Sequence, residues 1–224
     1  MKTNEQLQRD VQDAIKWEPL LQAAEIGVIV KEGVVTLTGV VDSYIKKIEA
    51  DSAAKNVAGV IAVIEQIEVV FSEERPVKTD AEIAKEALHA IQWNNELPAN
   101  KIQISVENGW VTLEGQLQRN DQKKSLHNAI KNLPGIRGVT NNIEIPEDSA
   151  SEVNREAIGD ALRRNSALHK MHVNVEVHNT KVILSGVVDS LFLKAEAERI
   201  AWNAPGVTAI VNNLTVNYVQ GNAG

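Results

Sequence analysis

The chain has 224 residues, of which 43% are hydrophobic and 4% aromatic, and it contains no cysteine. This composition is sufficient for packed cores of aliphatic residues, and it excludes disulfides, thiolate metal sites and cysteine nucleophiles. The formal net charge of −7 argues against a nucleic-acid partner, because phosphate contacts need a basic surface. We expect no transmembrane segment because the apolar runs are short, and a cytoplasmic protein because no signal peptide is visible.

One unit occurs three times along the chain, and this repeat predicts the architecture. In each copy a glycine ends a short apolar-alternating segment, and a second glycine follows twenty residues later. These structural glycines are Gly39 and Gly59, Gly115 and Gly135, and Gly186 and Gly206. Equivalent residues of successive copies are therefore 76 and then 71 positions apart. We predict three tandem domains, over residues 1–72, 78–147 and 149–219.

Each copy is predicted to have the element order α-β-β-α-β. A capping box, in which a threonine or serine precedes a glutamine or glutamate by three residues, opens the first helix. The three boxes are Thr3 with Gln6, Thr79 with Glu82, and Ser149 with Glu152. Two alternating segments follow, then an alanine-rich helix and a last strand. The predicted fold class is α+β, with two helices covering a small three-stranded sheet in each module.

A two-residue turn is predicted between the first two strands of each copy. Asn108-Gly109 is a strong signal for such a turn because both positions need a positive φ. Glu32-Gly33 occupies the same place in the first copy, and Asn179-Thr180, a poorer turn, in the third. The first two turns would pair Val30 with Val35 and Val106 with Val111.

The pattern of glycines, alanines and a closing Asn-Asn-Leu-x-Val strand resembles the BON domain family. Its best matches are the strands 141–145 and 212–216, whereas the first copy has Glu65-Gln66 in place of the two asparagines. The resemblance implies an αββαβ module associated with osmotic or envelope stress and thought to bind phospholipid. It also implies periplasmic export as the alternative to a cytoplasmic location.

Motifs for catalysis are missing from the sequence, which contains no P-loop, no Gly-x-Ser-x-Gly turn and no dinucleotide fingerprint. His169 and His172 lie in a predicted loop, where helical spacing would not align them on a metal. We therefore expect a non-enzymatic protein with no cofactor and no metal.

The middle copy contains a possible contact for an anionic phospholipid surface. Basic residues follow its second helix, and an outward-facing tryptophan comes just after its predicted turn, an arrangement that suits a membrane interface. The candidate residues are Trp110, Arg119, Lys123, Lys124, His127 and Lys131. A solvated helix face is the alternative interpretation of the same pattern.

Two further tryptophans, Trp17 and Trp93, occupy equivalent positions at the ends of the first helices. They would either cap their own cores or contact a neighbouring domain. The alternative to a lipid-binding function is a structural or protein-interaction module that uses its sheet edges and spare apolar residues.

Overall fold

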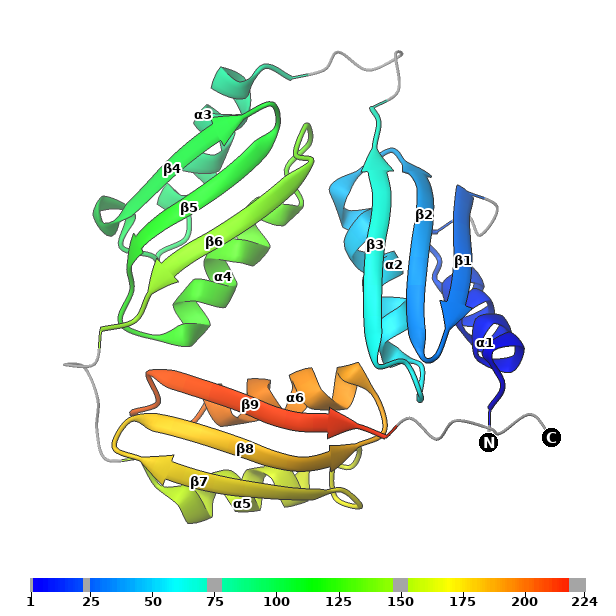
Figure 1. The fold of residues 1–224 in the computed structure, drawn as a ribbon. Helices are drawn as coiled ribbons and strands as arrows, with labels where there is room; N and C mark the ends of the chain where they lie inside the picture. The colour runs from blue at the N-terminus through cyan, green and yellow to red at the C-terminus, as the bar shows by residue number, and fades with distance from the viewer. Residues whose placement is uncertain (1, 22–24, 72–77, 147–152, 218–224) are drawn as a thin grey trace. The chain divides into compact units, whose positions relative to one another are not determined.

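The chain folds into αββαβ domains, each with one three-stranded sheet, as Figure 1 shows. The computed structural model describes residues 2–21, 25–71, 78–146 and 153–217. The first domain contains α1 (Asn4–Trp17), β1 (Ile26–Lys31), β2 (Val34–Val41), α2 (Tyr44–Asn56) and β3 (Ala62–Val69). The second contains α3 (Asp80–Gln92), η2 (Ala99–Lys101), β4 (Ile102–Glu107), β5 (Trp110–Gln116), α4 (Asn120–Lys131) and β6 (Gly138–Glu144). The third contains α5 (Arg155–Arg164), β7 (His172–His178), β8 (Lys181–Val188), α6 (Leu191–Trp202) and β9 (Ala209–Val216).

The second strand of each domain is central in its sheet, in the orders β1-β2-β3, β4-β5-β6 and β7-β8-β9. It pairs antiparallel with the first strand, and in the second and third domains it pairs parallel with the last strand. The parallel pairing requires a crossover connection, which the second helix of each domain provides. The predicted α+β class is therefore confirmed.

The predicted hairpins have the expected register, with Val30 opposite Val35 and Val106 opposite Val111. Asn108 and Gly109 have φ values of 51° and 79°, as a type I′ turn requires. Asp80, the first residue of α3, also accepts hydrogen bonds from both turn N–H groups, at 2.8 Å from Asn108 and 2.9 Å from Gly109. The tip of this hairpin is thus attached to the start of the preceding helix.

Two of the predicted capping boxes are confirmed. At the start of α1, the side chains of Thr3 and Gln6 each accept a hydrogen bond from the backbone N–H of the other residue. Thr79 and Glu82 form the same pair of bonds at the start of α3. For the first helix of the third domain, the predicted start was wrong. This helix, α5, begins at Arg155, and the side chain of Asn154 accepts a hydrogen bond from Ala157 N. Asparagine is among the preferred N-cap residues, which explains the later start. The predicted box of Ser149 and Glu152 lies outside the described residues.

The core of each domain lies between its two helices and one face of its sheet. In the second domain, side chains from α3, α4 and alternate positions of β5 form one buried cluster. Its fully buried members include Ile83, Ala87, Val111, Leu113, Leu126 and Ile130. The other face of the sheet has no helix over it (Figure 1). Residues that alternate with the core positions along each strand therefore lie on this open face.

Gly115 shows why a glycine is repeated near the end of each central strand. It has a φ of 129°, and a Cβ there would overlap with the carbonyl oxygen of Lys101, the residue just before β4. Gly39 and Gly186 have the same conformation and the same close approach to a backbone oxygen. Only glycine permits both at once.

Candidate functional site

The ammonium group of Lys123, on the predicted lipid-binding helix, is engaged within its own domain. Its Nζ donates a hydrogen bond of 2.7 Å to the carbonyl oxygen of Ile143 on the last strand. The neighbouring Asn141 side chain donates to the Lys123 carbonyl and accepts from Ile143 N, at 3.3 and 3.2 Å. Burial lowers the pKa of Lys123, and the nearby Glu144 partly opposes this shift. This lysine therefore connects α4 to β6 within the domain.

The third domain repeats this arrangement at the equivalent positions. Lys194 Nζ donates to the Leu214 carbonyl oxygen at 2.7 Å, and Asn212 donates to the Lys194 carbonyl at 2.9 Å. Asn212 also accepts a bond from Leu214 N at 3.2 Å. A contact that recurs in two domains indicates a structural requirement of the module.

The remaining basic side chains of α4 present less free charge than their spacing predicted. Arg119 forms a two-pronged ion pair with Asp121, at 2.9 and 2.5 Å, which raises the pKa of the arginine and lowers that of the aspartate. His127 is half-buried, and its pKa is lowered by burial and by Lys131. It is therefore neutral at pH 7. Lys124 and Lys131 are also half-buried.

Trp110 lies on the opposite side of the sheet from α4. Its neighbour Val111 points into the core with Leu126 and Ile130 of α4, so the alternation of the strand places Trp110 on the open face. There its ring covers Gly138, its partner on β6, where a Cβ would overlap with ring atoms. The sheet therefore lies between Trp110 and the basic residues of α4, and the structure does not bring these candidate residues together on one face.

Trp17 and Trp93 are the most exposed large apolar side chains of the described residues, at 85% and 84%. Neither caps its own core. Trp17 is the last residue of α1, two positions beyond the buried Ile15. Two residues correspond to about 200° around a helix, so Trp17 points away from the core. The same offset separates Trp93 from the buried Ile91, and this periodicity could have predicted both exposures from the sequence.

Each of these tryptophans has a second exposed apolar side chain close to it in sequence. Leu20, three residues after Trp17, is 53% exposed, and Leu88, five residues before Trp93, is 49% exposed. Lys85 and His89 precede Trp93 at intervals of four residues and are exposed on the same side of α3. Leu20 thus adds apolar surface near Trp17 at the end of α1, whereas Leu88 lies about 140° around α3 from Trp93.

The described residues contain no group of three or more histidine, aspartate or glutamate side chains placed to hold a metal ion. None of the helices in those ranges is long and apolar enough to cross a bilayer.

These features define a class of small tandem αββαβ modules that carry helices on one sheet face and leave the other face open. The sequence pattern of the BON domain matches residues 3–70, 79–147 and 151–218. Because these matches cover most of the chain, it belongs to the BON domain family.

The chain is similar to the osmotically-inducible protein Y of Escherichia coli (strain K12). It is 26% identical over 127 residues, which are 55% of this chain and 63% of that protein. The chain thus matches less than two thirds of the relative's length.

Among solved structures, CdsD, a structural protein of the type III secretion system of Chlamydia trachomatis, aligns with 96% of this chain and 92% of its own. The identity is 16% and the TM-score 0.27. The C-terminal domain of CdsD aligns with 93% of this chain and 96% of its own, at 16% identity and a TM-score of 0.25. Scores this low add nothing to the fold assignment.

Proposed function

We propose that this chain is a non-enzymatic binding protein whose first two domains contact phospholipid surfaces through Trp17 and Trp93. The observation that carries the proposal is their exposure, at 85% and 84%, at equivalent positions of two domains. Leaving an indole in water at both positions is unfavourable, and tryptophan is enriched at membrane–water interfaces, where its ring is apolar and its N–H is solvated.

Insertion of the rings, with a smaller contribution from charge, is the mode of contact that we propose. The net charge of −7 opposes adsorption on an anionic surface, Arg119 is paired with the Asp121 carboxylate, and the Lys123 ammonium is engaged by the Ile143 carbonyl. Binding should therefore depend only weakly on salt, in contrast to adsorption by a basic patch.

Co-sedimentation of the full chain with phospholipid vesicles tests this proposal. The variant W17S/W93S should bind roughly tenfold more weakly, because burial of each ring supplies much of the free energy of adsorption. The matched control is W110V/G138A, which removes the tryptophan of the open sheet face. It introduces the residues that the first domain has at these positions, Val34 and Ala62. This variant should bind vesicles as the wild type does. Equal binding of W17S/W93S and wild type would exclude these tryptophans as the contact.

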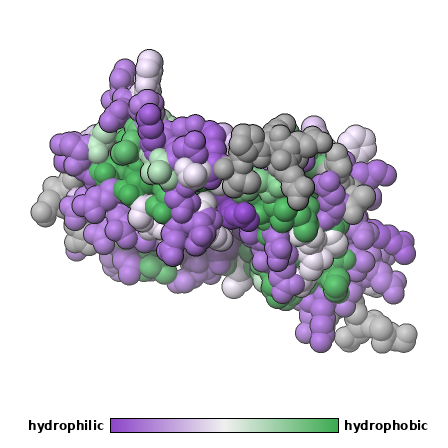
Figure 2. Space-filling view, turned by 90° about the horizontal axis from the view of Figure 1, so that it is seen from above, coloured by the Kyte–Doolittle hydropathy of each residue, from purple (hydrophilic) through white to green (hydrophobic). Residues whose placement is uncertain are grey.

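A second candidate function, protein interaction, is favoured by the open face of the first sheet. Ile29, Val40 and Ile64 lie on this face and are 62%, 48% and 47% exposed. The equivalent residues of the second domain are polar: Ser105, Gln116 and Thr140. Apolar side chains also reach the surface in several patches in Figure 2. Such patches are typical of interaction sites. If vesicles do not bind while I29S/I64S abolishes association with a protein partner, this second function replaces the first.

We further propose a role in osmotic or envelope stress, which the name of the Escherichia coli relative suggests. Comparing protein abundance before and after an osmotic upshift tests this role, and unchanged abundance together with normal growth of a deletion strain would contradict it. Fractionation of the same cells tests the expected cytoplasmic location against the periplasmic alternative.

A further inference from the structure

The two helices of the third domain border an open surface groove of about 460 Å³, and Ala157 and Arg164 in its lining are exposed. Its lining is mainly apolar and comes from α5, from α6 and from the turn that follows α6. The apolar lining residues are Ala157, Ile158, Ala161, Ile200, Ala204 and Pro205. Arg164, Asn165 and Asn203 complete the lining. A concave, mostly apolar site with a few polar groups is the usual form of a small-molecule site, and this volume lies within the usual range.

A lysine spans the equivalent position in each of the other two domains. In the first domain, Lys2 Nζ contacts Asp10 at 2.6 Å and donates to the carbonyl oxygen of Ala58 at 3.3 Å. Asp10 and Ala58 are the equivalents of Ala157 and Pro205, so this lysine bridges the helices where the groove lies in the third domain. The second domain has the ion pair of Lys78 with Glu86 at the same place.

The third domain has no such pair in its sequence, because Ser149 and Ala157 occupy the two positions. Its second helix carries Ile200 where the other domains have Ala53 and Ala129. The sequence of the third domain therefore lacks both the lysine and the acidic partner of this bridge, and it has a larger apolar residue on the second helix.

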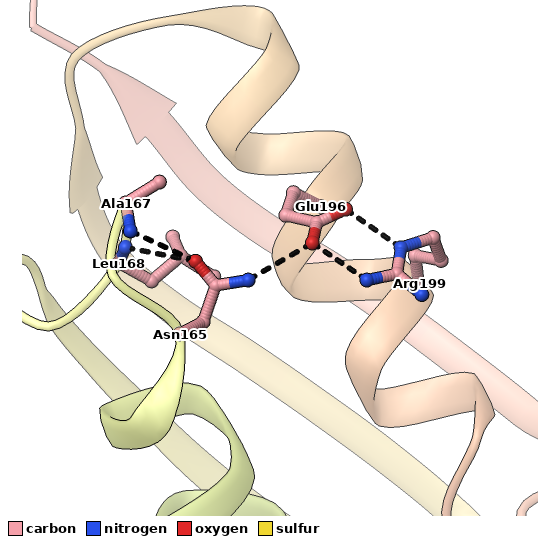
Figure 3. Close-up of polar contacts among 5 residues, drawn as sticks. All are labelled: Asn165, Ala167, Leu168, Glu196 and Arg199. Carbon is pink, nitrogen blue, oxygen red and sulfur yellow. Dashed lines mark hydrogen bonds and ion pairs between the residues drawn. The ribbon is translucent and has the colours of Figure 1, made fainter.

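One end of the groove is fixed by a polar contact between its two walls, shown in Figure 3. Asn165 ends α5 and donates from Nδ2 to Glu196 of α6 at 3.0 Å, while its Oδ1 accepts from the N–H groups of Ala167 and Leu168. Arg199 holds the same Glu196 carboxylate with two hydrogen bonds, at 2.7 and 2.6 Å. These bonds set the spacing of the helices, so the groove is formed before any ligand arrives.

A cationic side chain lies at this same end. Arg164 lines the groove, and it makes no hydrogen bond or ion pair with the residues that the structure describes. Trp17 and Trp93 occupy its position in the other domains, so the arginine is specific to the third domain. The neighbouring Arg163 is instead paired with Asp160.

We propose that this groove binds a single-chain amphipathic anion, namely a free medium-chain carboxylate. Its tail covers the alanines and Ile200, and its head group accepts hydrogen bonds from the Arg164 guanidinium, whose planar fork matches a carboxylate. An apolar floor next to the Arg164 guanidinium, which has no partner among the described residues, selects this ligand class. The site lies in a different domain from Trp17 and Trp93, and its ligand is bound from water as a monomer.

Isothermal titration of the full chain with dodecanoate, below the concentration at which it forms micelles, tests the proposal. We expect one site per chain. R164Q should bind about tenfold more weakly, since a charge-assisted pair is lost. A204L should abolish binding by filling the groove, and the fold accepts leucine here because the second domain has Leu133 at this position. R163Q is the matched control and should bind as the wild type does.

Two further titrations make the result specific. In the first, the wild type is titrated with uncharged dodecanol, whose affinity should not exceed that of R164Q for dodecanoate. In the second, W17S/W93S is titrated with dodecanoate and should bind it with the affinity of the wild type. Wild-type affinity in R164Q or A204L, or an absence of dodecanoate binding to the wild type, would overturn the proposal. Loss of binding in W17S/W93S would also overturn it, because the ligand would then be bound at the exposed tryptophans.

Discussion

Lys123 on α4 and Ile143 on β6 are joined by a hydrogen bond of 2.7 Å from the lysine ammonium to the isoleucine carbonyl. The third domain contains the same bond between Lys194 and Leu214, also at 2.7 Å. The lysine that follows the first turn of the second helix therefore fixes this helix to the last strand. Lysine side chains usually point into solvent, but in these two domains one lysine connects a helix to a strand of the same domain.

Replacing Lys123 by methionine should lower the stability of the second domain by about 1 kcal/mol, the net value of a typical hydrogen bond, with the apolar stem retained. Hydrogen–deuterium exchange of the full chain, followed by mass spectrometry, would show faster exchange in β6. K194M should have the same effect in β9. The control K131M removes a half-buried lysine of the same helix, and it should leave β6 protected. Unchanged exchange of β6 in K123M would show that the bond contributes nothing.

The pair formed by Trp110 and Gly138 gives a second prediction. A Cβ at position 138 would overlap with the indole ring, so G138A should destabilise the second domain by about 1–3 kcal/mol through overpacking. The other domains have alanine here, opposite Val34 or Lys181. The double variant W110V/G138A should therefore recover most of the loss in urea unfolding followed by circular dichroism. Additive losses in the double variant would show that the two residues do not interact.

The parts of the fold that depend on local patterns could be predicted from the sequence. The capping boxes at Thr3 and Thr79 and the Asn108-Gly109 turn rest on contacts between residues at most three apart. The register then follows, because a shift of one residue would move Val106 and Val111 off the buried face. The start of α5 was missed because asparagine and serine are both good N-caps, and only the folded chain selects Asn154.

The candidate site was harder to predict because its contacts join residues far apart in sequence. A helical projection gives the direction of Lys123, and the carbonyl that its ammonium reaches is twenty residues further on. The alternation of the strand placed Trp110 outside the core. Only the position of α4 relative to the sheet shows that Trp110 and the basic residues of α4 lie on opposite sides of it. The groove beside Arg164 likewise depends on how α5 and α6 meet.

Asp80 gives a third prediction, on the hairpin of the second domain. Its carboxylate accepts two hydrogen bonds from the turn, so D80A should lower the stability of this domain by about 1–2 kcal/mol. In the first domain the equivalent Asn4 accepts a single bond, from Glu32 N at 3.0 Å. N4A should therefore cost less than D80A. Amide exchange at Asn108 and Gly109, measured by NMR, would show the local opening, and full protection of these amides in D80A would contradict the prediction.

His127 gives a prediction about pH. Burial and the charge of Lys131 lower its pKa in the folded state, so the unfolded chain binds more protons than the folded chain as the pH falls. The folded second domain therefore loses stability from about pH 6.5, the unfolded value, down through the lower folded pKa. Above pH 7 the imidazole is neutral in both states and the loss vanishes.

An NMR titration of the full chain measures this effect directly. The imidazole of His127 should titrate with a midpoint below about 6.5, and K131Q should raise this midpoint by removing the neighbouring charge. In urea unfolding at pH 5 and pH 7.5, H127Q should reduce the difference in stability between the two values. H89Q, at an exposed histidine of the same domain, is the matched control and should leave that difference unchanged. A midpoint above about 6.5 would contradict the burial of His127 as the cause of the shift, and the same midpoint in K131Q would show that the charge of Lys131 does not act on this imidazole.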